Sequence, residues 1–403
     1  MIMKTWYNHA RYGMFIHWGP YSAAARGEWV ANRELYSKEE YTEECVRPFT
    51  AARFDPREWA RVARAAGMGY VVLTSRHHDG FCLWDTATTD FKSTLLGPGR
   101  DVVREYVDAI REAGLKVGLY YSVADWFHPD YPGAHARDWP QCWPDEEKRR
   151  RFVQFYHTQL EELMTRYGRI DLLWYDGCIP SPTDGEIINT RVRQLQPHML
   201  INNRNGEPYD VHCSEQIIKP GPAGKLWEAG MTLNDNWGYH AGDRQWKNAR
   251  AVVRMLTETA SIAGNLLLNV GPMADGAIPR ESVDILLEAG AWLRRNPGWL
   301  ADSGRSPFGW TNWGRITVKD DRVYLHVFNS TGSRLRVADI GNRVLRVSYL
   351  DGGGALPFTQ KGDLVIIDGI QSPPKDPIAT TIMMEVDGRP RTTRPQTSFW
   401  IPE

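Results

Sequence analysis

Up to about residue 300, the sequence alternates short apolar runs with amphipathic segments of helical length. Strands that alternate with helices form βαβ units around a parallel sheet, and strands buried on both faces are apolar nearly throughout. The apolar runs are YGMFIHWG (12–19), VVLTS (71–75), KVGLYYS (116–122), IDLLWYDG (170–177), HMLINNR (198–204), LWEAGMTL (226–233) and NLLLNVG (265–271). They predict an irregular (β/α)8-like, TIM-type barrel over residues 1–305, with one strand short or missing. A doubly wound sheet is the alternative, but the Gly-rich turn that often follows its first strand is absent.

The segments between these runs carry helix boundary signals. The clearest helix begins with Asp55 as N-cap and Pro56 at its first position. Glu58 is placed to complete a capping box, and Gly67 ends the helix. Further helices are predicted over residues 101–113, 145–167, 243–263 and 281–295, and another ends near Pro197. The strands are thus linked by helices, as a barrel of this type requires.

After residue 305 the pattern changes to short strands separated by turn residues. Residues 314–329 (GRITVKDDRVYLHVFN) are typical of a hairpin, and further strands are predicted within 334–340, 343–350, 362–369 and 378–386. This pattern predicts an all-β sandwich over residues 306–403. Both a structural role and a separate sugar-binding role stay open for it. The Pro-rich tail (388–403) is expected to be irregular, with Phe399, Trp400 and Ile401 packing back on the fold.

The composition excludes several kinds of partner. A formal net charge of −1 over 403 residues argues against nucleic acid and acidic membranes. No apolar segment reaches the roughly 18 residues of a membrane span, and no signal-peptide pattern opens the sequence. The five cysteines are well separated and form no CxxC motif, so reduced thiols and a cytoplasmic location are expected. The 17 Trp and 17 Tyr suit sugar binding, but they are equally good core material.

Polar and aromatic side chains recur where the apolar runs end. In a parallel barrel these ends meet at one face, which carries the chemistry. The side chains concerned are His17, Trp18, His77, His78, Asp79, Tyr121, Asp125, Trp126, Trp174, Asp176, Arg204, Glu207, Glu215, Glu228, Trp237, Tyr239 and Asn269. Any one of them alone is most often a turn or strand-end residue. Their recurrence along successive strands favours a functional site.

Carboxylates in an aromatic, His-rich pocket favour glycoside hydrolysis. In that reaction one carboxylate attacks or stabilises the anomeric carbon and a second protonates the leaving oxygen. A metal site would use His17, His78, Asp79 and Asp176, but the sequence has no HxH, HExxH or cysteine cluster. A serine nucleophile would require a GxSxG elbow, which is also absent. No metal and no cofactor are therefore expected.

Eight short motifs in the barrel portion resemble those of a known family. They are RYGMFIHWGPYS (11–22), EWV (28–30), RHHDGFCLWD (76–85), LYYSVADWFHP (119–129), LLWYDG (172–177), NNR (202–204), NDNWGYH (234–240) and NLLLNVGPMADGAIP (265–279). In this order the set resembles the α-L-fucosidases of glycoside hydrolase family 29. The resemblance implies an irregular barrel followed by a β-sandwich. It also implies a retaining exo-hydrolase that acts on fucosylated oligosaccharides or glycoconjugates through a covalent glycosyl-enzyme.

The resemblance also implies roles for individual residues. The family's nucleophile corresponds to Asp176. Its fucose-binding residues correspond to His17, Glu28, Trp29, His77, His78, Tyr121, Trp174 and Arg204. Trp237 is a candidate for the apolar wall that the methyl group of fucose requires. Adjacent strand residues point to opposite faces, so both histidines can reach one sugar only if the strand twists or bulges at His77.

The general acid/base is less clearly marked, and three glutamates compete for this role. Glu215 is preferred because it follows the Arg204 segment at about the family's distance and is predicted to lie in a loop. Glu228, inside a predicted strand, and Glu207 stay open as alternatives. Two departures from the usual family pattern affect the aglycone side of the pocket. Val30 stands where Tyr is common, and Asn205-Gly206 stands where an aromatic residue often follows.

The sequence leaves three hypotheses about the function open. The first is hydrolysis of α-L-fucosides, and the second is the same mechanism on a related sugar such as an α-L-galactoside. The third is a catalytically silent carbohydrate-binding protein, against which the presence of both Asp176 and Glu215 argues. A second copy of the chain, forming a homo-oligomer, is left open as a partner.

Overall fold

A computed structural model describes residues 5–132, 143, 145–178, 182–329, 332–374 and 376–394. The predictions for Phe399, Trp400 and Ile401 lie outside these residues. Within them the chain forms two compact units, the first of residues 12–246 and 267–286 and the second of residues 5–11, 247–266 and 287–394. The division between these units does not fall at residue 305, because it runs through one strand (265–270) and one helix (280–295). A domain boundary at residue 305 therefore stays a prediction.

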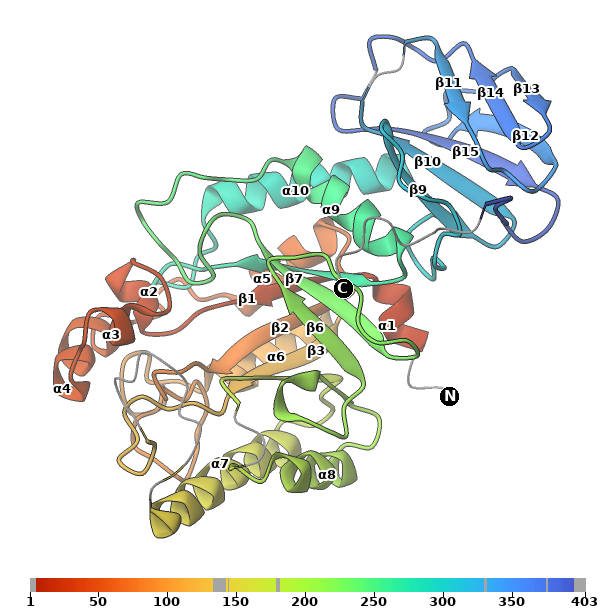
Figure 1. The fold of residues 1–403 in the computed structure, drawn as a ribbon. Coiled ribbons are helices and arrows are strands. Elements are labelled where there is room, and N and C mark those ends of the chain that lie inside the picture. The colour runs from red at the N-terminus through yellow and green to blue at the C-terminus, as the bar shows by residue number, and fades with distance from the viewer. Residues whose placement is uncertain are drawn as a thin grey trace. The chain divides into compact units, whose positions relative to one another are not determined.

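An eight-stranded parallel sheet forms a nearly closed barrel (Figure 1). Its strands are β1 (Tyr12–Ile16), β2 (Tyr70–Arg76), β3 (Lys116–Ser122), β4 (Leu172–Asp176), β5 (Leu200–Ile201), β6 (Val211–Glu215), β7 (Leu226–Thr232) and β8 (Asn265–Val270). The strand order is β5-β4-β3-β2-β1-β8-β7-β6. A single parallel bridge, between Asn202 and Val211, links the two edges. The predicted irregular barrel is confirmed, with eight strands in place of the seven predicted.

The strand that the sequence analysis missed is β6. Its sequence, VHCSE, is not a continuous apolar run, because only Val211 and Cys213 are buried while His212, Ser214 and Glu215 are partly exposed. No α-helix lies between β5 and β6 or between β6 and β7. Instead a short 3-10 helix, η3 (Asn203–Asn205), and a loop over residues 216–225 make these connections. The barrel is irregular at this edge because β6 has a solvent-facing side.

Elsewhere helices connect the strands. They are α2 (Tyr21–Ala24), α3 (Val30–Arg33), α4 (Lys38–Tyr41), the π-helical η2 (Thr42–Val46), α5 (Pro56–Ala65), α6 (Val102–Glu112), α7 (Glu146–Arg166), α8 (Gly185–Leu195), α9 (Ala249–Ser261) and α10 (Arg280–Arg295), with α1 (Thr5–Ala10) before β1. Asp55 caps α5 as predicted, by accepting from the backbone N–H of Arg57 and Glu58. The predicted capping box was wrong, because the Glu58 carboxylate pairs with Arg61 one turn along the helix, at 2.6 Å.

The second unit contains two antiparallel sheets. The four-stranded sheet has the order β12-β15-β10-β9 and the three-stranded sheet the order β11-β14-β13. The strands are β9 (Gly314–Lys319), β10 (Arg322–Val327), β11 (Arg334–Val337), β12 (Val344–Tyr349), β13 (Phe358–Lys361), β14 (Leu364–Asp368) and β15 (Thr380–Val386). Alternate side chains of both sheets, such as Val323, Leu325, Val365 and Ile367, share one buried core. This is the all-β sandwich that the sequence predicts.

Within the described part of the chain, no helix is both long enough and apolar enough to cross a lipid bilayer.

Candidate active site

A cavity of about 410 Å³ opens at the carboxyl ends of the barrel strands, within the first unit. Its walls come from segments far apart in the sequence, because strands β1 to β7 each contribute residues near or beyond their carboxyl ends. The lining residues are Phe15, His17, Glu28, Trp29, His77, His78, Tyr120, Trp174, Asp176, Gly177, Cys178, Arg204, Glu215 and Trp237. The cavity holds three carboxyl groups, three imidazoles and several aromatic rings, which is the chemistry that the strand ends predict.

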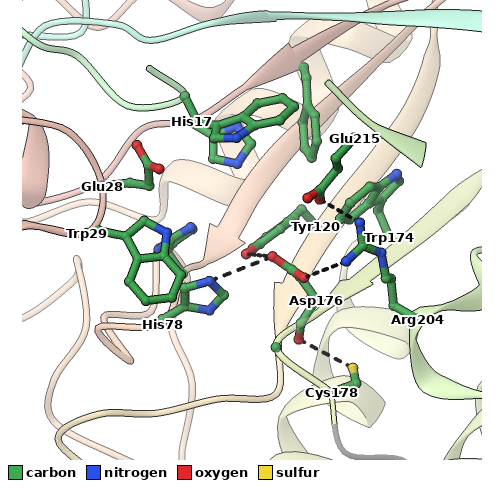
Figure 2. Close-up of a pocket in the computed structure, with 14 residues that line it drawn as sticks. His17, Glu28, Trp29, His78, Tyr120, Trp174, Asp176, Cys178, Arg204 and Glu215 are labelled. Carbon is green, nitrogen blue, oxygen red and sulfur yellow. Dashed lines mark hydrogen bonds and ion pairs between the residues drawn. The ribbon is translucent and has the colours of Figure 1, made fainter. Parts of the chain in front are cut away.

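Asp176, the last residue of β4, lies at the centre of this pocket (Figure 2). The hydroxyl of Tyr120 donates to Asp176 Oδ2 at 2.9 Å. Nε2 of His78 lies 3.7 Å from the same oxygen, and Nη1 of Arg204 lies 3.7 Å from Oδ1. The Asp176 side chain is 20% exposed, so it can meet a bound molecule. Its surroundings hold it in place by one hydrogen bond and one nearby cation.

Arg204 connects Asp176 to a second carboxyl. Its Nη2 lies 2.7 Å from Oε1 of Glu215, while Nη1 faces Asp176, so one guanidinium contacts both acids (Figure 2). Burial raises the pKa of Glu215, and the charge of Asp176 raises it further, while Arg204 opposes both effects. The net effect is a raised pKa for Glu215, whose carboxyl lies beside that of Asp176.

The three glutamates that compete for the acid/base role occupy different environments. Glu215 lines the pocket, but the prediction that it lies in a loop was wrong, because it is the last residue of β6. Glu228 is fully buried in β7, outside the pocket lining, where it accepts from Trp174 Nε1 at 2.8 Å. Glu207 is 64% exposed beside Lys225. Among the three, Glu215 is the one that can reach a molecule in the cavity.

Glu28 and Trp29 enter the pocket from the segment after β1. The backbone N–H of Gly238 donates to Glu28 Oε2 at 2.7 Å, and burial raises the pKa of Glu28. The Trp29 ring lies against His78, with ring centroids 5.3 Å apart. In Figure 2 both residues lie across the pocket from Glu215. They therefore form the wall opposite the Arg204–Glu215 pair.

Both histidines after β2 line the pocket, with ring centroids 4.0 Å apart. The register of β2 with β3 shifts between Thr74 and Arg76, which is the irregularity that the pair requires. The strand then ends at Arg76, so strict alternation no longer applies to His77 and His78. Gly80, with φ +75°, turns the chain as predicted, and its N–H donates to the carbonyl of His77 at 3.1 Å.

Burial keeps the pocket histidines neutral. It lowers the pKa of His17 and of His78 to about 4 in each case, and it lowers the pKa of His77 as well. The nearby charge of Asp176 works in the opposite direction on His17 and His78, but it is outweighed. Neutral imidazoles offer one hydrogen-bond donor and one acceptor each, which suits sugar hydroxyls.

Neighbouring side chains fix which nitrogen of His17 carries the proton. The Asn269 amide donates to the carbonyl of Trp237 at 2.7 Å, so its oxygen faces His17 Nδ1, also at 2.7 Å. His17 therefore donates from Nδ1 and keeps Nε2 as an acceptor. Ser122 does the same for His78, because its hydroxyl donates to the carbonyl of Ala124 and its oxygen then accepts from His78 Nδ1 at 2.6 Å.

A sequence model of the α-L-fucosidase family matches residues 1–298 of the chain. The chain belongs to the α-L-fucosidase family. The family and enzyme class that the motifs predict are therefore confirmed, and so is the fold of a barrel followed by antiparallel sheets. The chain is a glycoside hydrolase of family 29.

Several α-L-fucosidases are similar to this chain in sequence or structure along most of its length. α-L-Fucosidase isoenzyme 1 from Paenibacillus thiaminolyticus is 38% identical, with a TM-score of 0.89 over 96% of this chain and 99% of that one. A family 29 α-L-fucosidase from Bacteroides thetaiotaomicron is 25% identical, with a TM-score of 0.86 over 96% of each chain. It was solved as a trapped covalent intermediate with 2-fluoro-fucosyl fluoride, in a glutamate-to-glutamine mutant. The α-L-fucosidase of Dictyostelium discoideum is 30% identical over 405 residues, covering 86% of this chain and 83% of that protein.

The structure brings ten of the eleven predicted site residues to this pocket. They are His17, Glu28, Trp29, His77, His78, Trp174, Asp176, Arg204, Glu215 and Trp237. The prediction for Tyr121 was wrong about the face of β3. Tyr120 pairs with Trp174 across the sheet and shares its inward face, whereas Tyr121 points outward and donates to Gln159 of α7 at 2.7 Å. Two adjacent tyrosines cannot be told apart without the strand register.

Four lining residues were missed: Phe15, Tyr120, Gly177 and Cys178. Phe15 could have been found, because it lies two residues before His17 and strand side chains repeat with a period of two. Cys178 lies just beyond Asp176, and its thiol donates to the Asp176 carbonyl at 3.3 Å. No sequence pattern identifies Cys178 as a pocket residue. Among the described residues, no group of three or more His, Cys, Asp or Glu is arranged to hold a metal ion.

Proposed function

We propose that this chain removes terminal α-L-fucosyl groups from oligosaccharides or glycoconjugates by double displacement, with Asp176 as nucleophile and Glu215 as general acid/base. The observation that carries the proposal is the contact of one guanidinium, that of Arg204, with both carboxyls. Retaining glycosidases need two carboxyls roughly 5–5.5 Å apart. A shared guanidinium holds the two acids on one side of the pocket, which supports this pairing.

The two carboxyls would act in two steps. In the first, an oxygen of Asp176 attacks the anomeric carbon and the bond to the leaving oxygen breaks, while Glu215 donates its proton to that oxygen. In the second, Glu215 takes a proton from water as the water oxygen attacks the same carbon, and the ester to Asp176 breaks. The raised pKa of Glu215 favours a protonated acid in the first step. The covalent intermediate trapped in the Bacteroides relative is consistent with this route.

The remaining lining groups would bind the sugar. His17 Nε2 is an acceptor for a hydroxyl proton, and Glu28 is an acceptor opposite Glu215. Phe15, Trp174 and Trp237 supply apolar surface, and Trp237 lies against His17 with ring centroids 5.1 Å apart. We assign Trp237 to the methyl group of fucose. Because an α-L-galactoside carries a hydroxyl on that carbon, an aryl α-L-galactoside should be turned over more slowly than the fucoside.

Azide rescue tests the two roles separately. With an activated aryl α-L-fucoside, Asp176→Ala should lose activity by about 10³-fold or more, and azide should restore it with formation of the β-fucosyl azide. Glu215→Ala should keep the first step on this good leaving group, and azide should restore turnover with formation of the α-fucosyl azide. NMR of the azide product reports the configuration in each case.

Glu207→Ala is the matched control, because Glu207 is exposed and outside the pocket. Its kinetics should match those of the parent enzyme. The proposed nucleophile would be wrong if Asp176→Ala kept full turnover. The proposed acid/base would be wrong if the azide product of Glu215→Ala had the β configuration or if that variant were unimpaired on a poor leaving group.

A further inference from the structure

Glu228 is a buried carboxyl that the proposed mechanism does not use. It lies in β7 with a fully buried side chain, inside the barrel and outside the pocket lining. Burying a carboxyl among apolar strands is unfavourable unless its oxygens accept hydrogen bonds. We propose that Glu228 is a positioning residue that orients Trp174 and, through it, the two side chains that hold Asp176. This inference rests on the proposed function, because it acts through the nucleophile.

Three other strands send a donor to the Glu228 carboxyl. Trp174 Nε1 of β4 donates to Oε1 at 2.8 Å, and the Tyr70 hydroxyl of β2 donates to Oε2 at 2.8 Å. The Cys213 thiol of β6 donates to Oε1 at 3.3 Å. Both carboxyl oxygens are therefore hydrogen-bonded within the barrel. An indole ring whose N–H is fixed in this way has little freedom to rotate.

Gly13 of β1 makes room for one of these donors. It pairs with Tyr70, and a Cβ at this position would lie 2.4 Å from Cζ of the Tyr70 ring. The Tyr70 ring therefore occupies the space that a side chain on β1 would fill. Because Gly13 has no side chain, the Tyr70 ring fits beside it and the Tyr70 hydroxyl reaches Glu228. Neither Gly13 nor Tyr70 lines the pocket.

Trp174 contacts both side chains that hold Asp176, namely Tyr120 and Arg204. Its indole stacks on the Tyr120 ring, with centroids 5.6 Å apart and planes at 17°, and the Arg204 guanidinium carbon lies 5.5 Å from its centre. Tyr120 donates to Asp176 Oδ2, and Arg204 faces Oδ1. A turn of the indole would displace both contacts, and misplacing reacting groups by about 1 Å can slow a reaction about 100-fold.

Glu228→Leu and Glu228→Gln test this role on an aryl α-L-fucoside. The leucine removes both acceptors, so kcat should fall by about 10- to 100-fold with little change in KM. The acidic limb of the kcat/KM profile should also move to higher pH, because Tyr120 and Arg204 stabilise the nucleophile less well. The glutamine keeps an acceptor for Trp174, and its amide can donate to the Tyr70 oxygen, so it should restore most of kcat.

Tyr106→Phe is the matched control for the loss of a buried hydrogen bond. The Tyr106 hydroxyl donates to the carbonyls of Val71 and Gly118, away from the pocket. Its removal should lower Tm and leave both kcat and the pH profile unchanged. Trp174→Phe, which keeps a ring but loses the N–H, should reproduce the loss of kcat and the shifted acidic limb of Glu228→Leu, and the double variant should have a kcat no lower than that of either single variant.

The proposal is overturned if folded Glu228→Leu, or Trp174→Phe should the leucine variant not fold, keeps kcat and its acidic limb. Independent, additive losses in the double variant would overturn it as well. Asp176→Ala is measured in parallel. If Asp176→Ala is inactive while Glu228→Leu is not, the positioning role fails alone. If Asp176→Ala retains turnover, the proposed function itself fails.

Discussion

At the scale of single residues, the pocket depends on side chains that do not line it. Asn269 is the clearest case, because its amide donates to one carbonyl and so fixes the orientation of its oxygen toward His17. Ser122 has the same relation to His78. Such partners decide whether an imidazole presents a lone pair or an N–H to the ligand.

Asn269→Asp should turn His17 from an acceptor into a donor. A carboxylate beside Nδ1 raises the pKa of a histidine that burial otherwise lowers to about 4, so His17 would gain a second N–H. KM for the aryl fucoside should rise about tenfold, since one mispaired buried polar group costs about 1–3 kcal/mol. Asn342→Asp is the control, because Asn342 makes similar backbone contacts in the second unit. An unchanged KM for Asn269→Asp would contradict the assigned tautomer.

Asp79 should make stability depend on pH. Burial raises its pKa to about 6, from an ordinary value of 3.8, despite hydrogen bonds from the Tyr41 hydroxyl and the Phe81 N–H. Because the folded state binds this proton more tightly, the contribution is complete below about pH 4 and is lost as pH rises through 6. Asp79→Asn should therefore gain stability relative to the parent by about 2 kcal/mol between pH 4.5 and 7.5. Chemical denaturation at both pH values measures it, and a pH-independent difference would contradict it.

At the scale of elements, the decisive feature is how β2 ends. A register shift before Arg76 and a left-handed turn at Gly80 bring two adjacent histidines to one pocket. The turn also packs closely, because a Cβ on Gly80 would lie 2.4 Å from Oδ1 of Asp125. Asp125 in turn pairs with the buried Arg76, so the turn is fixed by an ion pair beneath it.

Gly80→Ala should therefore damage both the fold and the pocket. Strain at positive φ together with the contact on Asp125 should destabilise the protein by about 2–4 kcal/mol and raise KM through displacement of His77. Gly99→Ala is the matched control, with φ +65° and no atom within 4 Å of the added Cβ. It should cost only the backbone strain, about 1–2 kcal/mol, with KM unchanged. Equal Tm losses in the two variants would show that the Asp125 contact does not matter.

At the scale of the whole molecule, the proposed chemistry uses carboxyls alone. No metal-binding group of three or more suitable side chains occurs in the part of the chain described by the structure. Treatment of the purified enzyme with a chelator should therefore leave both aryl-fucoside turnover and Tm unchanged. Loss of turnover that a divalent cation restores would contradict the proposed mechanism.

Fucose itself should stabilise the enzyme against heat. A ligand present at 100 times its Kd stabilises the state that binds it by about 2.7 kcal/mol. The Tm should rise with fucose concentration in the parent enzyme and in Glu207→Ala, and rise less in Asn269→Asp. A Tm that does not respond to fucose would contradict the assignment of this cavity to the sugar.

Much of the fold could be predicted from local pattern. Apolar strands alternating with capped helices indicated the barrel, and short strands between turn residues indicated the sandwich. The prediction failed where one face of a strand meets solvent. In Val211–Glu215 only Val211 and Cys213 are buried, so the segment has no apolar run and the sequence predicts a loop there, which includes Glu215.

The sequence by itself determined the family, most of the strand ends that line the pocket and most of the residue types there. The family follows from the resemblance of the motifs, and the strand ends and residue types follow from residue order and from a period of two along each strand. Only the tertiary structure decided that Tyr120 and not Tyr121 faces Asp176, that Glu215 and not Glu228 or Glu207 shares Arg204 with it, and that Glu228 is tied to Trp174. These choices depend on the register between strands and on contacts between residues far apart in the chain, which no local pattern specifies.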